Sequence, residues 1–355
     1  MHFLLRAIHL RCFLFSLFVA GSLFAQNPNV QQSNTTENLR GISMVDGQIA
    51  WASGTHGTYL RTTDGGKSWR AAQLPGAEPL DFRDVEAFGA NVAYLLSAGP
   101  GDQSRIYKTI DAGKNWALQF TNKNPKGFFD CMAFWNRDHG IVVGDPVPDN
   151  SGRLRFELIA TEDGGENWKA ISADHLPPAV EGEGAFAASG TCIAVHGNST
   201  VWFATGGKVA RVFHSADAGK TWNVADTPIV HGPESAGIFS IAFRDAIHGV
   251  IAGGDYKHPE QDGPHLAVTE DGGVTWKLSP ISPQAYFSAI AFTQLPAGDK
   301  ALLVVGSARS AYAENLTKKS WQKTWDLNLN ALSISQSGKA MAVGPKGLIV
   351  SLSVK

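Results

Sequence analysis

The segment Thr62-Thr63-Asp64-Gly65-Gly66-Lys67-Ser68-Trp69 decides the fold, because close copies of it recur along the chain. Each copy has an Asp, a Gly two residues later and a Trp three residues after that Gly. The four further good copies are Thr109–Trp116, Thr161–Trp168, Ser215–Trp222 and Thr269–Trp276, and a decayed sixth copy, Glu314–Trp321, keeps only the Trp. Successive Trp residues lie 45 to 54 residues apart, a spacing typical of the blades of a β-propeller.

A second periodic signal sets the number of repeats. Seven strand-like runs are each followed by an apolar run that ends in Gly. The seven leading runs are 39–45, 82–88, 129–134, 191–195, 238–243, 287–292 and 331–335. Four short strands per repeat predict an all-β, seven-bladed propeller of four-stranded antiparallel blades. The last repeat reaches the end of the sequence after three strands, so we expect a strand near Val30–Thr35 to complete it and close the ring.

The recurring octapeptide has a local physical explanation. The Asp can accept hydrogen bonds from nearby backbone N–H groups, and the Gly can adopt positive φ without a steric penalty. The Trp then opens the fourth strand as a large apolar wedge. We therefore interpret all of these residues as structural rather than catalytic: Asp64, Gly66, Trp69, Asp111, Gly113, Trp116, Asp163, Gly165, Trp168, Asp217, Gly219, Trp222, Asp271, Gly273 and Trp276.

Residues 1–25 have the pattern of a secretory signal. Two Arg residues precede a short apolar run, and small residues end the segment. We therefore expect one propeller domain over residues 26–355 in an exported protein, periplasmic or secreted, with no later membrane span. The chain carries a formal net charge of −2 and only 17% charged residues, which disfavours disorder and nucleic-acid binding. Cys131 and Cys192 are compatible with two buried thiols or with one disulfide.

The recurring octapeptide resembles the Asp-box repeat, which is also called the BNR repeat. The sequence around the first octapeptide narrows the resemblance to one family. It is similar to the photosystem II stability/assembly-factor-like family over Asn38–Ser43, Ala50–Gly54 and Gly57–Gly66. That resemblance implies an exported or lumenal seven-bladed propeller, and the photosynthetic members of the family are assembly chaperones without catalysis. A more distant resemblance links the Asp boxes to sialidase-type propellers.

The longest loops are expected on the face opposite the Asp-box turns, and long loops on a rigid scaffold commonly carry function. Arg40 and Arg83 hold matching positions at the start of the first two innermost strands and could line the mouth of the central channel. The alternative is that they form salt bridges between blades. The candidate binding residues are Arg40, Arg83, Asp84, Asp130, Asp145, Glu183, Asp255 and Tyr256.

A glycoside hydrolase or lyase is the alternative function, because Asp boxes also occur in sugar-cleaving propellers. Such enzymes need paired carboxylates, and sialidases add three arginines. The chain has no Phe-Arg-Ile-Pro segment, and a third arginine is absent from the starts of the inner strands, so a sialidase is disfavoured. Asp255, His258, Glu260 and Asp262 could hold a metal, but an exposed polar loop explains them as well, and we predict no metal or cofactor.

The sequence thus predicts a non-catalytic scaffold that binds a protein partner in the cell envelope, and we expect it to be a monomer. Two observations separate this function from hydrolysis. A hydrolase needs two carboxylates about 5–10 Å apart across one pocket. A scaffold is expected to show a broad face without strongly shifted carboxylates.

Overall fold

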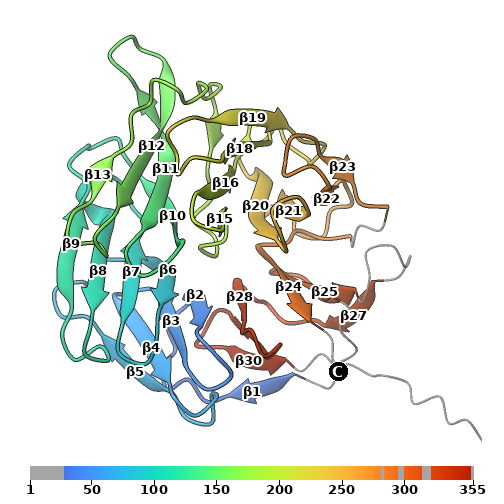
Figure 1. Cartoon of the computed structure of the whole chain (residues 1–355). Helices are drawn as coiled ribbons and strands as arrows, with labels where there is room; N and C mark the ends of the chain where they lie inside the picture. The colour runs from blue at the N-terminus through green and yellow to red at the C-terminus, as the bar shows by residue number, and fades with distance from the viewer. Residues whose placement is uncertain (1–27, 281–283, 295–299, 314–320, 353–355) are drawn as a thin grey trace, which may run out of the picture.

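Seven β-sheets surround a central axis in the computed structural model, which describes residues 28–280, 284–294, 300–313 and 321–352 (Figure 1). The predicted signal segment and Glu314–Ser320 of the decayed sixth box lie outside the described residues. No helix within the described ranges is long and apolar enough to cross a membrane. The predicted seven-bladed, all-β architecture is confirmed.

Each blade contains a four-stranded antiparallel meander that runs from the axis outward, and in blade five two further short strands, β14 (Glu183–Gly184) and β17 (Gly206–Gly207), extend the sheet beyond the innermost strand of the meander. The first three blades are β2 (Leu39–Met44), β3 (Ala50–Gly54), β4 (Thr58–Thr62), β5 (Arg70–Gln73); β6 (Phe82–Ala87), β7 (Ala93–Ser97), β8 (Arg105–Thr109), β9 (Ala117–Thr121); and β10 (Phe129–Phe134), β11 (Gly140–Pro148), β12 (Leu154–Thr161), β13 (Lys169–Ala170). The next three are β15 (Ile193–His196), β16 (Thr200–Ala204), β18 (Arg211–Ser215), β19 (Asn223–Asp226); β20 (Ala236–Phe243), β21 (Gly249–Asp255), β22 (Leu266–Thr269), β23 (Lys277–Leu278); and β24 (Ala289–Gln294), β25 (Lys300–Val305), β26 (Ser310–Ala313), β27 (Gln322–Trp325).

The seventh blade closes the ring with both ends of the described chain. It consists of β28 (Ala331–Ile334), β29 (Ala340–Val343), β30 (Ile349–Leu352) and the N-terminal strand β1 (Asn29–Gln31). Val30 pairs with Val350 in an antiparallel register. The predicted closing strand is therefore present, and its pairing covers the edge that β30 would otherwise expose.

Apolar side chains fill the spaces between neighbouring blades. The described residues form seven hydrophobic clusters, and each cluster joins two adjacent blades. The Asp-box Trp of a blade packs against the preceding blade: Trp69 against blade seven, Trp168 against blade two and Trp222 against blade three. The repeated Trp is thus the wedge between blades, and burying its large apolar surface stabilises the ring.

The Asp-box turns are held by a common set of hydrogen bonds. In the first box, Thr62 Oγ1 donates to Asp64 Oδ1 at 2.8 Å and accepts the N–H of Gly66 at 2.9 Å. Asp64 Oδ1 also accepts the N–H of Ser68 at 3.0 Å. The other four boxes repeat these contacts. Because the turn engages each Asp carboxylate, these carboxylates have a structural explanation that requires no substrate.

Two of the boxes carry an Ala where the turn favours Gly. The residue after the box Asp is Ala112 with φ +69° and Ala218 with φ +59°, whereas the other three good boxes have Gly there. Left-handed backbone costs a non-Gly residue roughly 1–2 kcal/mol. We predict that Ala112→Gly raises the free energy of unfolding by about 0.5–1 kcal/mol in denaturant titrations. Ala117→Gly, on the exposed strand β9, is the control and should lower the free energy of unfolding. An equal decrease in the free energy of unfolding of both variants would contradict the prediction.

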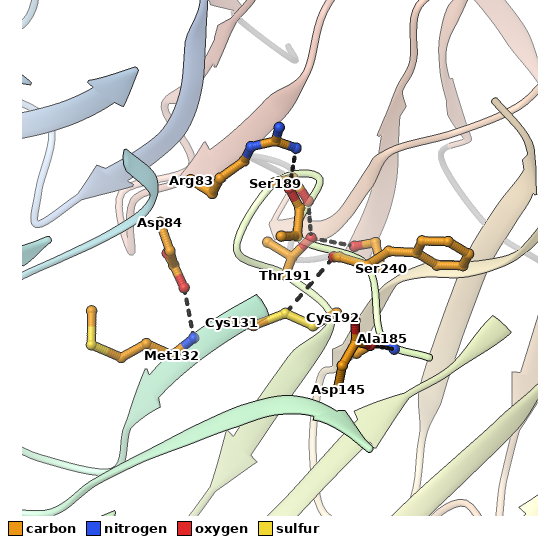
Figure 2. The surroundings of a disulfide bond; sticks show 12 residues. Arg83, Asp84, Cys131, Met132, Asp145, Ala185, Ser189, Thr191, Cys192 and Ser240 are labelled. Carbon is orange, nitrogen blue, oxygen red and sulfur yellow. Dashed lines mark hydrogen bonds between the residues drawn. A yellow bond between two sulfur atoms is a disulfide. The ribbon is translucent and has the colours of Figure 1, made fainter. Parts of the chain in front are cut away.

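A disulfide joins Cys131 to Cys192, with their Cα atoms 6.0 Å apart. Cys131 lies in β10, the innermost strand of blade three, and Cys192 directly precedes β15 of blade four. Both side chains are fully buried. The bridge links two neighbouring blades close to the axis (Figure 2), which resolves the alternatives that the sequence left open.

Candidate functional site

A cavity of about 730 Å³ opens at one end of the central channel. Loops that follow second strands and loops that connect blades line it, so it lies on the face where the sequence predicts the long loops. Its lining comprises Asn38, Arg40, Arg83, Phe128, Asp130, Asp145, Ala185, Phe186, Ala187, Ala188, Phe239, Tyr256, Tyr286, Ser288, Ser307, Asn328, Asn330 and Pro345. We call this space the mouth cavity.

β-Bulges bring four of these side chains to the axis. In blades one, two, three and five, the pairing of the innermost strand shifts register at Arg40, Arg83, Asp130 and Phe239, respectively. A bulge places two residues opposite one and re-aims the side chain of the extra residue. The same structural feature in different blades therefore supplies two cations, a carboxylic acid and an aromatic ring to one cavity.

One carboxylate serves both arginines. Asp81 Oδ2 lies 2.6 Å from Arg83 Nε and 3.9 Å from Arg40 Nε. Burial, followed by the nearby Arg83 charge, lowers the pKa of Arg40. Since two guanidinium groups share one Asp81, this side of the mouth cavity retains an excess positive charge that favours an anionic ligand group.

Two acidic side chains lie on another side of the mouth cavity. Burial and the adjacent Asp145 raise the pKa of Asp130 well above its ordinary value, and burial raises the pKa of Asp145 to about 6. Asp145 Oδ1 accepts the N–H of Ala185 at 2.9 Å, and the nearby backbone N–H of Ala187 partly opposes the rise in the pKa of Asp130. Asp130 Oδ2 is buried without a hydrogen-bond partner. Both carboxyl groups therefore face peptide N–H groups of the chain itself.

Aromatic rings form the third part of the mouth cavity. The rings of Phe186 and Phe239 stack with centroids 3.9 Å apart, and Tyr286 meets Phe239 edge-on at 4.8 Å. Tyr256 completes the group at 6.2 Å from Phe239 and is 48% exposed. These rings offer an apolar shelf beside the arginines, and a polar hydroxyl on each Tyr.

The structure brings five of the predicted binding residues into the mouth cavity: Arg40, Arg83, Asp130, Asp145 and Tyr256. The other three lie elsewhere. Asp84 accepts the N–H of Met132 at 2.7 Å and lines a second cavity. Glu183 is buried in an ion pair with Arg211, and Asp255 accepts the N–H of Lys257 and contacts His258 Nδ1 at 2.8 Å. The described residues contain no group of three metal-ligating side chains, at Asp255 or elsewhere.

Sequence reasoning missed Asp81, Phe186 and Phe239. The search for a third arginine compared Phe129 and Ile238 with Arg40 and Arg83. The bulges show that the equivalent residues lie one position later, at Asp130 and Phe239. The correct alignment still contains no third arginine. Aligning the residue that follows the apolar residue before each bulge, namely Leu39, Phe82, Phe129 and Ile238, could have found Phe239, whereas no local signal marks Phe186.

The sequence is similar to known assembly factors. A family model described as "Photosynthesis system II assembly factor YCF48" matches residues 14–128. The chain is 26% identical over 253 residues to "Photosystem II assembly lipoprotein Ycf48" of Synechococcus sp. (strain CC9902), a match that covers 70% of this chain and 64% of the relative. The chain resembles the photosystem II assembly factors.

Two more comparisons agree with this resemblance. "Photosystem II stability/assembly factor HCF136, chloroplastic" of Arabidopsis thaliana is 26% identical over 121 residues, which are 33% of this chain and 27% of that protein. A solved structure titled "YCF48 bound to D1 peptide" has a TM-score of 0.61 and 17% identity, and it covers 94% of this chain and 100% of its own. The structural match supports the fold. The chain spans less than two thirds of the length of both curated assembly factors.

Proposed function

We propose that this protein is an exported, non-catalytic scaffold that binds a segment of a protein partner in the mouth cavity. The observation that carries this proposal is the juxtaposition of two arginines, which share a single Asp81, with an aromatic shelf around Phe239. Such a site suits a peptide that carries an acidic group beside an apolar side chain. The relative whose title names a bound D1 peptide supports a peptide ligand for this propeller class.

Two further observations support export. A disulfide between Cys131 and Cys192 is typical of an oxidising compartment. The curated Synechococcus relative is called a lipoprotein, which is consistent with an exported protein. We propose specifically that the protein is a periplasmic or secreted monomer.

The binding test uses fluorescein-labelled hexapeptides that each contain one glutamate and one phenylalanine, with alanine replacements of either residue. We predict that Arg40→Ala/Arg83→Ala weakens binding of the best hexapeptide at least 30-fold, because each charge-assisted hydrogen bond contributes about 1.5–3 kcal/mol. Fluorescence anisotropy measures the dissociation constant. Arg153→Ala is the matched control, since this arginine is 63% exposed and does not line the mouth cavity. Unchanged binding by the double variant would overturn the proposal.

Glycoside hydrolysis is the second candidate, and one observation favours it. Asp130 and Asp145 both have raised pKa values in one cavity, which is not the unshifted surface expected of a scaffold. The backbone N–H of Ala185 already binds Asp145, however, and that of Ala187 faces Asp130, which favours binding over acid–base catalysis. Turnover of aryl glycosides by the wild-type protein, abolished by Asp145→Asn, would establish the hydrolase instead.

A further inference from the structure

A stretch of the chain itself lies across the central channel. We call Ala185–Thr191 the axial segment; it precedes Cys192 and the short inner strand β15. Ala185–Ala188 line the mouth cavity, whereas Ser189–Thr191 line a second cavity of about 440 Å³ that also contains Asp84 and Glu86. The axial segment therefore separates two cavities of one channel, and Figure 2 shows parts of it between Arg83, Asp145 and Ser240.

The mouth cavity binds the backbone of the axial segment as it would bind a peptide. Arg83 Nη1 donates to the carbonyl oxygen of Ala187 at 2.9 Å. The N–H of Ala185 donates to Asp145 Oδ1 at 2.9 Å, and the backbone N–H of Ala187 faces Asp130. These contacts recognise peptide groups, which every chain carries, so they do not depend on the covalent link to this protein.

The side chains of the axial segment also follow a recognisable pattern. Phe186 stacks face to face on Phe239, with an interplanar angle of 9°. The neighbours of Phe186 are Ala185 and Ala187, which let the backbone approach Asp145 and Arg83 closely. An aromatic residue between small residues can therefore stack on Phe239 while its neighbouring peptide groups bind the polar side chains of the mouth cavity.

The two ends of the axial segment are held differently. At its C-terminal end, Ser189 Oγ donates to the carbonyl oxygen of Ser288 at 2.8 Å, the Thr191 hydroxyl lies 2.7 Å from the Ser240 hydroxyl, and Cys192 is covalently bound to Cys131. Ala185–Ala188 are held in the mouth cavity by hydrogen bonds to Arg83 and Asp145 and by the ring stack, Ala185 also packs in the core cluster between blades three and four, and the pairing of β14 with β17 fixes the two residues that precede them. Displacement of this part leaves the disulfide and the inner strand in place.

We propose that Ala185–Ala188 is an internal ligand that occupies the peptide subsites of the mouth cavity, and that a partner segment binds by taking its place. This inference rests on the proposed function and specifies the ligand: an extended peptide with an aromatic residue between small residues. The internal ligand competes at an effective concentration of the order of millimolar, as for short tethers, so it lowers the apparent affinity for the partner. Weakening it should raise that affinity.

The first test uses a probe that copies the axial segment, an acetylated, fluorescein-labelled peptide Gly-Ala-Phe-Ala-Ala-Ser-Gly. We expect Phe186→Ala to bind this probe at least 10-fold more tightly than the wild type does, because the shelf is vacated. Replacing the phenylalanine of the probe by alanine should remove the gain, and adding Arg83→Ala to the variant should weaken binding about 10-fold. Phe120→Ala is the matched control, since Phe120 is a similarly half-buried ring outside the mouth cavity.

The second test uses the wild-type protein and so does not depend on a variant that folds. Hydrogen exchange followed by mass spectrometry should show faster exchange in fragments covering residues 183–190 when the best hexapeptide of the binding test is saturating. Equal probe affinity of wild type and Phe186→Ala, or unchanged exchange in these fragments, would overturn the inference. If either of these results is found but binding of the hexapeptide still depends on Arg40 and Arg83, the proposed function is kept and only the internal-ligand inference is wrong. If binding does not depend on these arginines, the proposed function and the inference are both wrong.

Discussion

The Cys131→Ala/Cys192→Ala variant is expected to unfold about 5 °C below the wild type. The disulfide spans 61 residues, and closing a loop of that length in the unfolded chain stabilises the fold by about 4 kcal/mol in the chain-entropy model. The expected shift in the melting temperature is small for that free energy because a domain of this size has a large unfolding entropy. Calorimetry of both proteins without reductant measures the difference.

The control for this prediction is the wild type after reduction under mild denaturation, which should melt with the double variant. The variant should also show faster hydrogen exchange in the axial segment, because Cys192 fixes its C-terminal end. Two free thiols in the oxidised mature protein, together with equal melting temperatures, would contradict the expectation.

The Asp84→Asn variant is expected to be more stable than the wild type at pH 8 by about 3 kcal/mol. Asp84 is 4% exposed, and burial raises its pKa from 3.8 to about 7, with Glu86 as a neighbour whose pKa is raised for the same reason. The native state therefore keeps a proton that the unfolded chain has lost, so the free energy of unfolding falls as the pH rises from about 4 through about 7. Asparagine has no such proton, and its oxygen can still accept the N–H of Met132.

Denaturant unfolding between pH 5 and pH 8 measures this effect. The stability of Asp84→Asn should change less with pH than that of the wild type, and the two proteins should converge towards pH 5. Asp102→Asn is the control, because Asp102 lies 75% exposed in the short 3₁₀ turn η1 (Gly101–Gln103). Parallel pH profiles for Asp84→Asn and the wild type would show that Asp84 is ionised in the fold throughout this range.

The sequence by itself determined the architecture. The Asp boxes are local: each hydroxyl, carboxylate and glycine lies within a few residues of its partners, so one turn structure follows from one octapeptide. Counting the strand pairs then predicts seven blades, and the three-stranded last repeat predicts closure by the N-terminal strand. The matching positions of Arg40 and Arg83 were also visible, because equivalent residues of repeats occupy equivalent places.

Only the tertiary structure decided which groups meet at the axis. Asp84 and Asp130 lie in neighbouring inner strands, but Asp130 lines the mouth cavity and Asp84 lines the second cavity. The reason is that each bulge re-aims one residue, which is Asp130 in β10 but Arg83, the neighbour of Asp84, in β6. The pairing of Phe186, in the axial segment, with Phe239 of blade five, and of Cys131 with Cys192, joins residues more than 50 positions apart in the sequence. Such contacts depend on the register and closure of the whole ring, and no local pattern encodes them.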